Sequence, residues 1–581
     1  MNQEIIDTAT GREAGTGPRA DRVLSTACWS LALLLLGFLA LTQLEVLVSF
    51  AAGWRVSPVV APVGLVAAFG AGDWLARREG LHWRLRLAIP AAALIVVCGA
   101  VLLSAAFFDL SWDGLWYHQT AVYQMAHGWN PLRDPMRTFD PTVVDSLRHY
   151  SKGPWYIALS LFATTSHIEW AKAAPWIALA AMFLAVAAAL VEFGTRRRDA
   201  AVVAALVSLN PVVIFELVSS LVDGLLISFL ACYVAALAAG IRRPRTLVHA
   251  VLATSAVLCI NTKFSGLVYL CFFCAAGGVY LIMRQRRSLM RFAAAQAAWI
   301  LLGVAGFGFN PYVTNTLYRG HPFYPWMGTA AHPGYTAHGQ DPVERWETPH
   351  NMLGRSRLVR FSYALFGRPG AQPYYPGENA ILMRPFDVGW KDFTIYYFHD
   401  VRISGFGPLF SGAFLIALVL LGAALVRPGW PREIVLLALI AIVASLLSGV
   451  HMWWARYGPQ LWWLPVIAVA AGLAVPGWRA VRWAAWGLAA LLAVNALLVE
   501  AVHFRWEIQA TRTTHEQLAS LRDKGEVQVD FQYFREPFSE RLRAAGVAFL
   551  ATRRLGCRNP MELMSISPGY PGAVRACIQE K

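Results

Sequence analysis

The chain has 581 residues, of which 57% are hydrophobic and only 15% are charged. A soluble domain carries about a quarter charged residues; together with a mean hydropathy of +0.46, this excludes a water-soluble enzyme and a disordered scaffold. The net charge of +15 does not indicate a nucleic-acid partner, because the basic residues stand in short clusters between apolar runs. We therefore expect a polytopic membrane protein whose basic residues report its topology.

Taken in chain order, the apolar runs predict about 13 transmembrane helices in residues 23–500. Each run holds roughly the 20 residues that a spanning helix needs. Residues 1–22 are polar, and we expect a disordered cytoplasmic N-terminus there. The first run lacks a small-residue cleavage site, so it is expected to remain as an anchor. The runs begin near Val23, Ser57, Leu85, Trp170, Ala200, Ser219, Thr246, Phe264, Leu289, Gly407, Glu433, Pro459 and Val481.

The positions of arginine predict the orientation of these helices. Arginine clusters at residues 77–86, 196–198 and 242–245 fall at the ends of alternate runs, and basic loops stay in the cytoplasm. The external loops are then residues 109–169 and 309–406, and residues 501–581 are also outside. The 44 Arg against 6 Lys and the abundant Ala suggest a bacterium with a GC-rich genome. The predicted location is a bacterial inner (plasma) membrane, with a periplasmic C-terminus.

Residues 501–581 are predicted to form a small α/β module. A helical pattern at 514–524 leads to a strand at 527–531, and a helix at 540–545 leads to a strand at 547–551. Cys557 and Cys577 would lie in an oxidising compartment and are expected to form a disulfide. A module of this size gains stability from such a link.

Two carboxylates stand just past the third predicted span, at Asp109 and Asp113. Downstream, apolar residues recur at helical spacing to about residue 126, which predicts an amphipathic helix in the outer membrane interface. A second such helix is expected from residue 153 to about 167. A carboxylate at this place suits a general base that deprotonates an acceptor hydroxyl. The alternative is that Asp113 only caps the first interfacial helix.

Cations are scarce at the outer edge of the membrane, where we find Lys152, Lys263 and Arg456. They could bind a phosphate or pyrophosphate through charge-assisted hydrogen bonds, or they could extend to lipid headgroups. Asp223 is expected either to pair with one of these cations or to contact substrate. The loop 309–406 is rich in aromatic residues, and we expect an ordered cover that binds a sugar or a lipid tail.

The order and sidedness of these motifs resemble the C-type (GT-C) glycosyltransferases, such as lipid A aminoarabinose transferase and protein O-mannosyltransferases. Asp113 stands where members of that family place a catalytic Asp, and Lys152 stands in the element that opens their second interfacial helix. Many members have Glu after this Asp; Gly114 stands here instead, which leaves Asp109 as the candidate second carboxylate. We expect substrate contacts from Asp223 and, by resemblance, from Tyr117, His118, His321, Tyr324 and Tyr457.

The resemblance implies transfer of a sugar, with inversion, from a polyprenyl-phosphate-linked donor to a hydroxyl of a glycan, lipid or protein acceptor. Asp113 would be the base, and Lys152, Lys263 and Arg456 would stabilise the leaving phosphate. The alternatives are an oligosaccharide ligase or polymerase that uses a pyrophosphate-linked lipid, and a transporter of lipid-linked glycans. We expect membrane lipids but no nucleic acid as partners. No cofactor is predicted, although a divalent metal stays open because some relatives use one.

Overall fold

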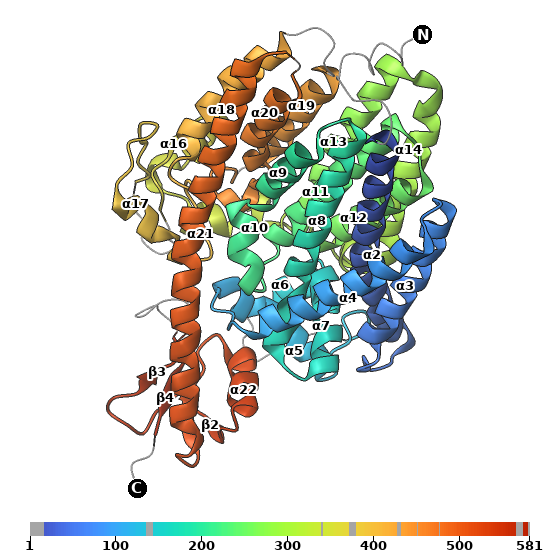
Figure 1. Ribbon diagram of the computed structural model, residues 1–581. Coiled ribbons are helices and arrows are strands. Elements are labelled where there is room, and N and C mark those ends of the chain that lie inside the picture. Colours follow the sequence, from blue (N-terminus) through green and yellow to red (C-terminus); the bar gives the residue numbers. More distant parts are fainter. Residues whose placement is uncertain are drawn as a thin grey trace.

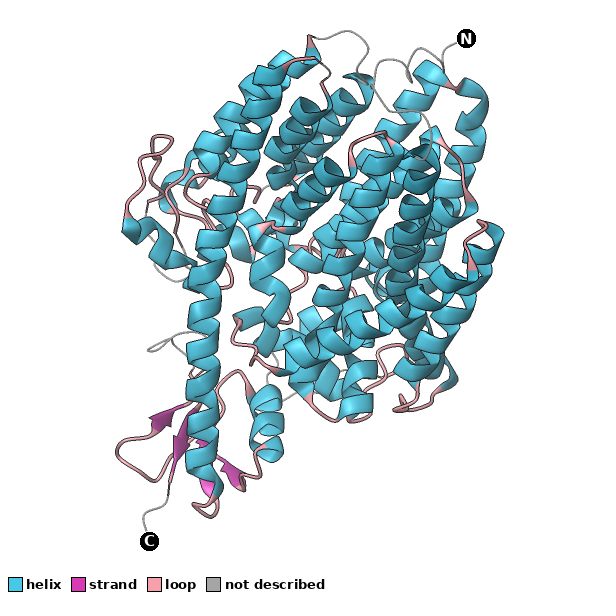
Figure 2. Ribbon diagram, viewed as in Figure 1, coloured by secondary structure: helices cyan, strands magenta, loops and turns pink. Residues whose placement is uncertain are grey.

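The helices run side by side as a bundle, and a small sheet lies at one end (Figures 1 and 2). This computed structural model describes residues 17–134, 143–338, 341–370, 379–426, 432–449, 451–475, 477–564 and 573–578. The predicted helical membrane fold with a small tail module is confirmed. The predicted disordered N-terminus lies mostly outside the described residues. The first helix begins at Gly17, and its Asp21 pairs with Arg197 at 2.7 Å.

Seven helices in the described part are long and apolar enough to cross a membrane. An eighth span is formed if two helical segments bent by 59° are taken together, namely residues 197–208 and 211–218. The break between them falls at Asn210 and Pro211, where the Asn210 side chain accepts the backbone N–H of Val212 and caps the second segment. The seven are α2 (Gly17–Ala52), α4 (Trp83–Ala105), η3 (Ile168–Ala173) with α8 (Ala174–Glu192), α11 (Asp223–Arg242), α13 (Phe264–Arg284), α14 (Arg286–Leu301) with η5 (Leu302–Phe307), and α21 (Arg479–Arg522).

Each of the 13 predicted apolar runs forms a helix, although only part of them reach the length and hydropathy of a span by themselves. The bent pair consists of α9 (Arg197–Ser208), followed by α10 (Pro211–Phe215) and η4 (Glu216–Val218). The other five runs form helices that do not reach the length and hydropathy of a span, several with only 12 to 17 residues. Helices this short are stabilised mainly by packing against neighbours. They are α3 (Val60–Arg78), α12 (Thr246–Thr262), α18 (Phe410–Leu425), α19 (Arg432–Ser448) and α20 (Trp463–Ala474).

The arginine-rich turns lie together at one end of the bundle. Arg245 contacts Glu79 at 2.7 Å and Glu192 at 2.8 Å, and Arg482 contacts Asp199 at 2.7 Å. These pairs join the turns that follow α3, α8, α11 and α20. Direct contacts between these turns thus support the predicted grouping of the arginine clusters on one side.

The opposite end carries short helices and turns from the two long predicted loops. The helices α5 and α7 lie near the lower end of the bundle in Figure 1, where interfacial helices were expected. The first loop forms η1 (Gly114–His118), α5 (Gln119–Ala126), α6 (Val144–His149) and α7 (Gly153–Thr165). The second forms η6 (Phe309–Val313), α15 (Thr314–Arg319), η7 (Tyr335–His338), η8 (Val343–Glu347), η9 (His350–Met352), α16 (Arg357–Phe366), α17 (Trp390–Thr394) and η10 (Ile395–Tyr397), and a later turn forms η11 (Ala455–Tyr457) and η12 (Pro459–Trp462).

The tail module is joined to the bundle by one continuous helix. The 44 residues of α21 run from the last span into the module, so the predicted boundary at residue 501 falls inside a helix. No Gly or Pro interrupts residues 488–522, which explains why the helix does not end at the membrane surface. The sheet has the order β2-β1-β4-β3, with β1 and β2 parallel. Its elements are β1 (Val527–Asp530), α22 (Arg535–Ala544), β2 (Phe549–Ala551), β3 (Met561–Glu562) and β4 (Arg575–Cys577).

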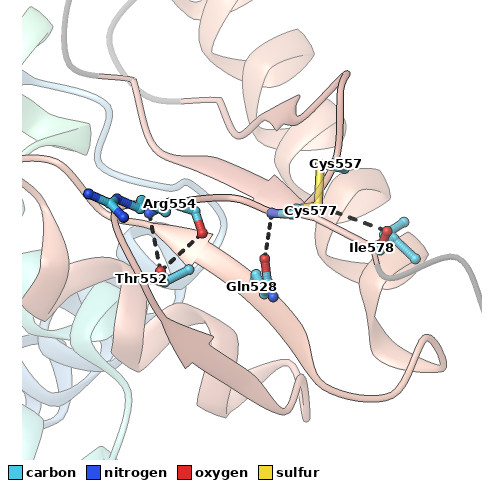
Figure 3. Close-up of a disulfide and its surroundings, with 7 residues drawn as sticks. Gln528, Thr552, Arg554, Cys557, Cys577 and Ile578 are labelled. Atoms are coloured by element: carbon cyan, nitrogen blue, oxygen red, sulfur yellow. Dashed lines mark hydrogen bonds between the residues drawn. A yellow bond between two sulfur atoms is a disulfide. The ribbon is translucent and has the colours of Figure 1, made fainter.

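A disulfide joins Cys557 to Cys577 of β4, one of the two inner strands of this sheet (Figure 3). The two Cα atoms are 5.9 Å apart, and the link spans 20 residues of sequence. It ties the loop between β2 and β3 to the strand β4. The sequence showed β1 and β2, but it did not show β3 and β4.

Candidate active site

An ion pair between Asp113 and Arg456 lies at the centre of the candidate site. The guanidinium Nη1 of Arg456 is 2.8 Å from the carboxylate Oδ2 of Asp113, across 343 residues of sequence. Both side chains are largely buried, at 19% and 12% exposure. Arg456 also approaches Asp400, with 3.6 Å between its Nε and the Asp400 Oδ1. The end of the third predicted span, the turn before α20 and the second long loop therefore meet at one point.

Local structure leaves the Asp113 side chain available for this contact. Asp113 directly precedes η1, but its carboxylate accepts no capping hydrogen bond from that helix. The alternative that Asp113 serves only as a helix cap is therefore not what the structure has. Arg456 lies in η11, which is fixed by the hydroxyl of Tyr269 donating to the backbone carbonyl of Tyr457 at 2.6 Å.

A second ion pair lies beside the first. The ammonium of Lys263 is 2.6 Å from Asp223 Oδ1 and 4.5 Å from the centre of the Tyr457 ring. Lys263 is a single extended residue between α12 and α13, so the chain reverses there and the side chain leaves the helix pair. Asp223 is the first residue of α11 and is 4% exposed, whereas Lys263 keeps 29% exposure. The expected pairing of Asp223 with a cation is present.

The electrostatics keep Asp113 ionised. Burial raises the pKa of the Asp113 carboxyl, but the positive charges of Arg456 and Lys263 outweigh burial, and the pKa is lowered from its ordinary value. For Lys263 burial alone would lower the pKa, but the neighbouring Asp223 reverses this and the pKa is raised. The site thus holds charged groups of both signs within a poorly solvated space.

Donor groups remain available on both cations. The Nε of Arg456 is buried and makes no hydrogen bond within the described residues. The ammonium of Lys263 has three N–H donors and donates one hydrogen bond to Asp223. The carboxylates of Asp113, Asp223 and Asp400 form ion pairs with these two cations. An anionic ligand would therefore share the cations with carboxylates that already hold them in place.

Aromatic side chains enclose the carboxylate of Asp113. The rings of Tyr117 and Tyr150 meet edge to face at 5.8 Å, and Asp113 helps to raise the pKa of both hydroxyls, after burial, which is the main cause. His118 accepts a hydrogen bond from the indole N–H of Trp155 at 2.7 Å. Burial lowers the pKa of His118 to about 3, so this imidazole is neutral at physiological pH.

Lys152, predicted as a phosphate ligand, has a different position. Its ammonium is buried and donates to the backbone carbonyls of Arg148 at 3.0 Å and Tyr150 at 2.5 Å. Burial lowers its pKa well below the ordinary value. It therefore supports the turn between α6 and α7, which carries Tyr150, and does not stand beside Asp113 with Arg456 and Lys263. The sequence could place Lys152 at this end of the bundle but could not give the direction of its side chain.

Asp109, predicted as a second catalytic carboxylate, is fully buried away from this site. Its carboxylate accepts hydrogen bonds from the backbone and hydroxyl of Ser111, and from the backbone N–H of Ser220 at 2.7 Å. Burial and the nearby Glu169 raise its pKa. These contacts hold the chain in front of Asp113, and a catalytic role for Asp109 stays a prediction.

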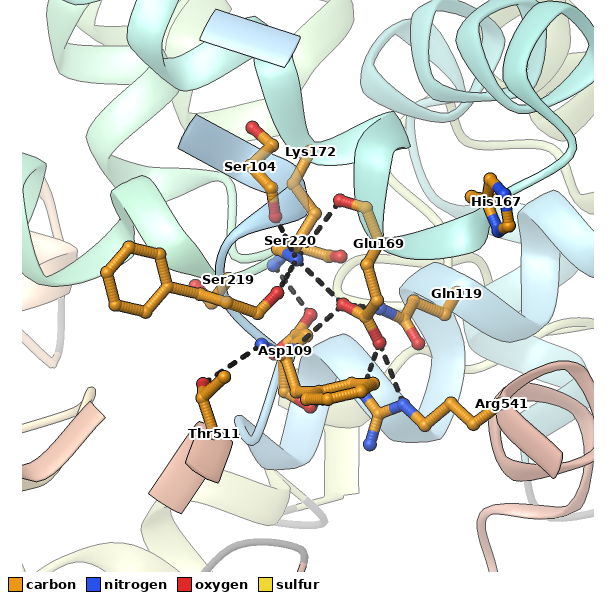
Figure 4. A network of polar contacts seen from close by, with 12 residues as sticks. Ser104, Asp109, Gln119, His167, Glu169, Lys172, Ser219, Ser220, Thr511 and Arg541 are labelled. Atoms are coloured by element: carbon orange, nitrogen blue, oxygen red, sulfur yellow. Dashed lines mark hydrogen bonds and ion pairs between the residues drawn. The ribbon is translucent and has the colours of Figure 1, made fainter. Parts of the chain in front are cut away.

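A network of charges surrounds Asp109 and ties the tail module to the bundle (Figure 4). The carboxylate of Glu169 forms an ion pair with Lys172 at 2.7 Å and another with Arg541 of α22 at 2.6 Å. Glu169 also accepts the backbone N–H of Asp109 at 2.9 Å, and Arg541 donates to the Asp109 carbonyl at 2.5 Å. The segment that leads to Asp113 is therefore held in place by η3, at the start of the span that continues as α8, and by the module.

Gly114 is explained by the same arrangement. A Cβ atom at this position would lie 2.2 Å from the hydroxyl of Ser111 and 2.3 Å from the carboxylate of Asp109. No side chain fits there unless Asp109 leaves. The buried carboxylate of Asp109 thus takes the space next to residue 114, where related enzymes were expected to carry Glu.

His321 and Tyr324, predicted to contact substrate, lie in a neighbouring layer. The Tyr324 ring packs edge to face on His149 at 4.7 Å, and Asn315 holds both the His149 ring and the Tyr324 carbonyl. His321 accepts the backbone N–H of Phe323 at 3.1 Å. These contacts connect Tyr324 with His149, which directly precedes Tyr150 in the turn that Lys152 supports. No direct contact with Asp113 is among the described interactions.

Two residues of the site were not found from the sequence, Asp400 and Trp454. The indole N–H of Trp454 donates to Asp400 at 2.5 Å, and its ring lies between the guanidinium groups of Arg456 at 4.5 Å and Arg402 at 4.0 Å. Trp454 stands two residues before Arg456, so a cation–π contact was the one local signal available. Asp400 has no such signal, because it lies in a long loop without a repeating pattern.

Comparisons with known proteins give a distant structural likeness. No protein-family model matches the chain, and no curated protein matches it. Among solved structures, the chain is similar to ArnT from Cupriavidus metallidurans bound to undecaprenyl phosphate, with 13% sequence identity and a TM-score of 0.43 over 80% of this chain and 85% of that one.

Replacing Arg541 should loosen the segment that carries Asp113. An Arg541→Met substitution leaves Glu169 with one cation fewer in a buried place, and breaking such a pair costs about 3–5 kcal/mol. We expect a clearly lower thermal unfolding temperature in detergent for Arg541→Met. Arg543→Met is the matched control, because Arg543 is on the same helix but its side chain is half exposed. Equal unfolding temperatures for the two variants would contradict the structural role of Arg541.

Proposed function

We propose that the chain is a membrane glycosyltransferase that moves a sugar from a polyprenyl-phosphate-linked donor to an acceptor hydroxyl. The observation that supports this most is the meeting of Asp113, Arg456 and Lys263 at the end of the bundle away from the arginine-rich turns. A carboxylate base and two cations beside one another are the groups that such a transfer requires.

In the proposed reaction, Asp113 takes the proton from the acceptor hydroxyl as its oxygen attacks the anomeric carbon. The bond between that carbon and the phosphate oxygen breaks, and its electron pair leaves with the lipid phosphate. Arg456 and Lys263 then stabilise the charge that grows on the phosphate. A single displacement of this kind inverts the anomeric centre. The hydrogen bonds come from the unused donors of Lys263 and from the Nε–H of Arg456, which makes no hydrogen bond among the described residues although Asp400 lies 3.6 Å away.

The position of the site favours a lipid-linked donor on the side opposite to the arginine clusters. Positive clusters remain in the cytoplasm, so the site would face the outside, where soluble nucleotide sugars are not available. We propose a bacterial inner membrane with the N-terminus in the cytoplasm and the tail module in the periplasm. The ArnT structure was obtained with undecaprenyl phosphate, and a lipid monophosphate of this class is the first donor carrier to test.

Asp113→Asn should lower the rate of sugar transfer by about 10²–10⁴-fold, because an amide cannot accept the proton. Binding of polyprenyl phosphate should be retained. The measurement is transfer by the purified protein in nanodiscs, with donors extracted from membranes and products followed by mass spectrometry. Asp400→Asn is the control, because it also removes a carboxylate from Arg456 but leaves the base. Undiminished turnover by Asp113→Asn would remove Asp113 from the mechanism.

Lys263→Met should weaken the binding of polyprenyl phosphate by about 10- to 100-fold, the loss expected for one charge-assisted hydrogen bond. Lys152→Met is the matched control, because its ammonium serves backbone carbonyls, and its dissociation constant should change little. The dissociation constants are measured by titration of the proteins in nanodiscs. Equal weakening by both substitutions would contradict the assignment of phosphate binding to Lys263. Comparing a monophosphate with a pyrophosphate-linked donor separates the transferase from the ligase alternative.

The pH profile of kcat/KM should show no loss of rate between pH 7 and pH 5. A base works in its deprotonated form, and the pKa of Asp113 lies below its ordinary value near 4 because Arg456 and Lys263 outweigh burial. In Arg456→Gln the largest lowering influence is gone, so the pKa of Asp113 should rise and the acid limb should move to higher pH. An acid limb that keeps its position in Arg456→Gln would show that another group controls it.

A further inference from the structure

Three buried side chains outside the candidate active site converge on one small space. His399 comes from the segment between η10 and α18, and His503 and Glu507 come from α21. Each offers one ligand atom, and these atoms lie within 4.8 Å of one another; no other such group of three occurs among the described residues. His503 and Glu507 are four residues apart, which places them on the same face of the helix.

Among the described residues, the polar atoms of this group are poorly satisfied. Both ring nitrogens of His503 and the Oε2 of Glu507 are buried without a hydrogen bond, and the Nε2 of His399 lies 3.1 Å from Glu507 Oε1. The exposed fractions are 7% for His399 and 0% for the other two. Burying several polar atoms without partners is costly, so a missing partner at the centre of the three is the economical explanation.

We propose that His399, His503 and Glu507 bind a divalent transition-metal cation, with zinc as the first candidate. Two imidazole nitrogens and one carboxylate are a zinc donor set, and they leave a fourth position for water. Calcium and magnesium prefer oxygen ligands throughout, which argues against them here. Zinc bound at about 2.0–2.2 Å would draw the ligand atoms closer together than they are in this structure.

The surroundings of the group also suit a metal. The backbone carbonyls of Phe215, Tyr396 and Tyr397 lie close to the His503 ring, and a histidine that binds a metal usually donates its other N–H to such a group. The positive charge of Lys172 acts on both His399 and Glu507. Lys172 is itself paired with Glu169 at 2.7 Å, and this contact reduces its effect on an added cation.

A metal here would fix one side of the candidate active site without taking part in the reaction. Asp400 follows His399 directly and contacts Trp454 and Arg456. Binding of His399 to α21 would therefore hold Asp400, and through it the guanidinium that pairs with Asp113. The metal site itself does not rest on the proposed function, because metal content is measured without any assay of sugar transfer.

The test uses the full chain in detergent, purified with a tag that lacks histidine and equilibrated with buffered Zn²⁺ before unbound metal is removed. We expect about one zinc per chain by elemental mass spectrometry. Substitution with Co²⁺ should give the visible absorption of a four-coordinate ion. His503→Ala and Glu507→Gln should lower the bound metal at least tenfold under the same conditions. The controls are His515→Ala and Glu500→Gln, on the same helix but outside the group, and they should bind as the wild type does.

A second measurement keeps the proposal testable if a variant folds poorly. Zn²⁺ should raise the thermal unfolding temperature of the wild type, and a chelator should reverse the rise, whereas neither should affect Glu507→Gln. Absence of stoichiometric metal in the wild type would overturn the proposal and indicate that Glu507 is buried as a neutral acid beside His399. Metal that remains in both His503→Ala and Glu507→Gln would overturn it as well, because it would belong to another site.

Discussion

The ion pair between Asp113 and Arg456 is the contact on which the candidate site depends. Both groups are largely buried at the end of a helical bundle, where an unpaired charge is costly. Each charge therefore requires the other, and the chain must bring the end of α4 to the turn before α20. Asp400, Trp454 and Tyr457 collect around Arg456, so this one pair determines which parts of the loops can approach the site.

Asp109 and Asp113 are four residues apart, yet they have opposite roles because their surroundings differ. Asp109 is saturated by hydrogen bonds from Ser111 and Ser220 and supports the chain. Asp113 faces two cations, which hold its pKa low, and it keeps some exposure. Gly114 makes this division possible, because any side chain there would occupy the space of the Asp109 carboxylate.

The sequence predicts what depends on hydropathy and sidedness, and it fails where pairing between distant residues decides. Apolar runs locate the helices, and the positions of Asp113, Lys263 and Arg456 between successive runs place them at one end. The direction of the Lys152 side chain depends on backbone carbonyls two and four residues away, which no pattern reveals. The extension of α21 into the tail was also missed, because the change from apolar to polar residues suggested a boundary although no helix breaker is present.

The long helix α21 connects the tail module with both sides of the candidate site. At its end the module presents Arg541, which holds Glu169 and the carbonyl of Asp109 in front of Asp113. Near its middle, His503 and Glu507 face His399, the residue before Asp400. A displacement of α21 would therefore reach Asp113 by way of Asp109 and Arg456 by way of Asp400. One member of the central ion pair is supported from α22 of the module and the other from α21, the helix that leads into the module, so the module outside the bundle is mechanically part of the site.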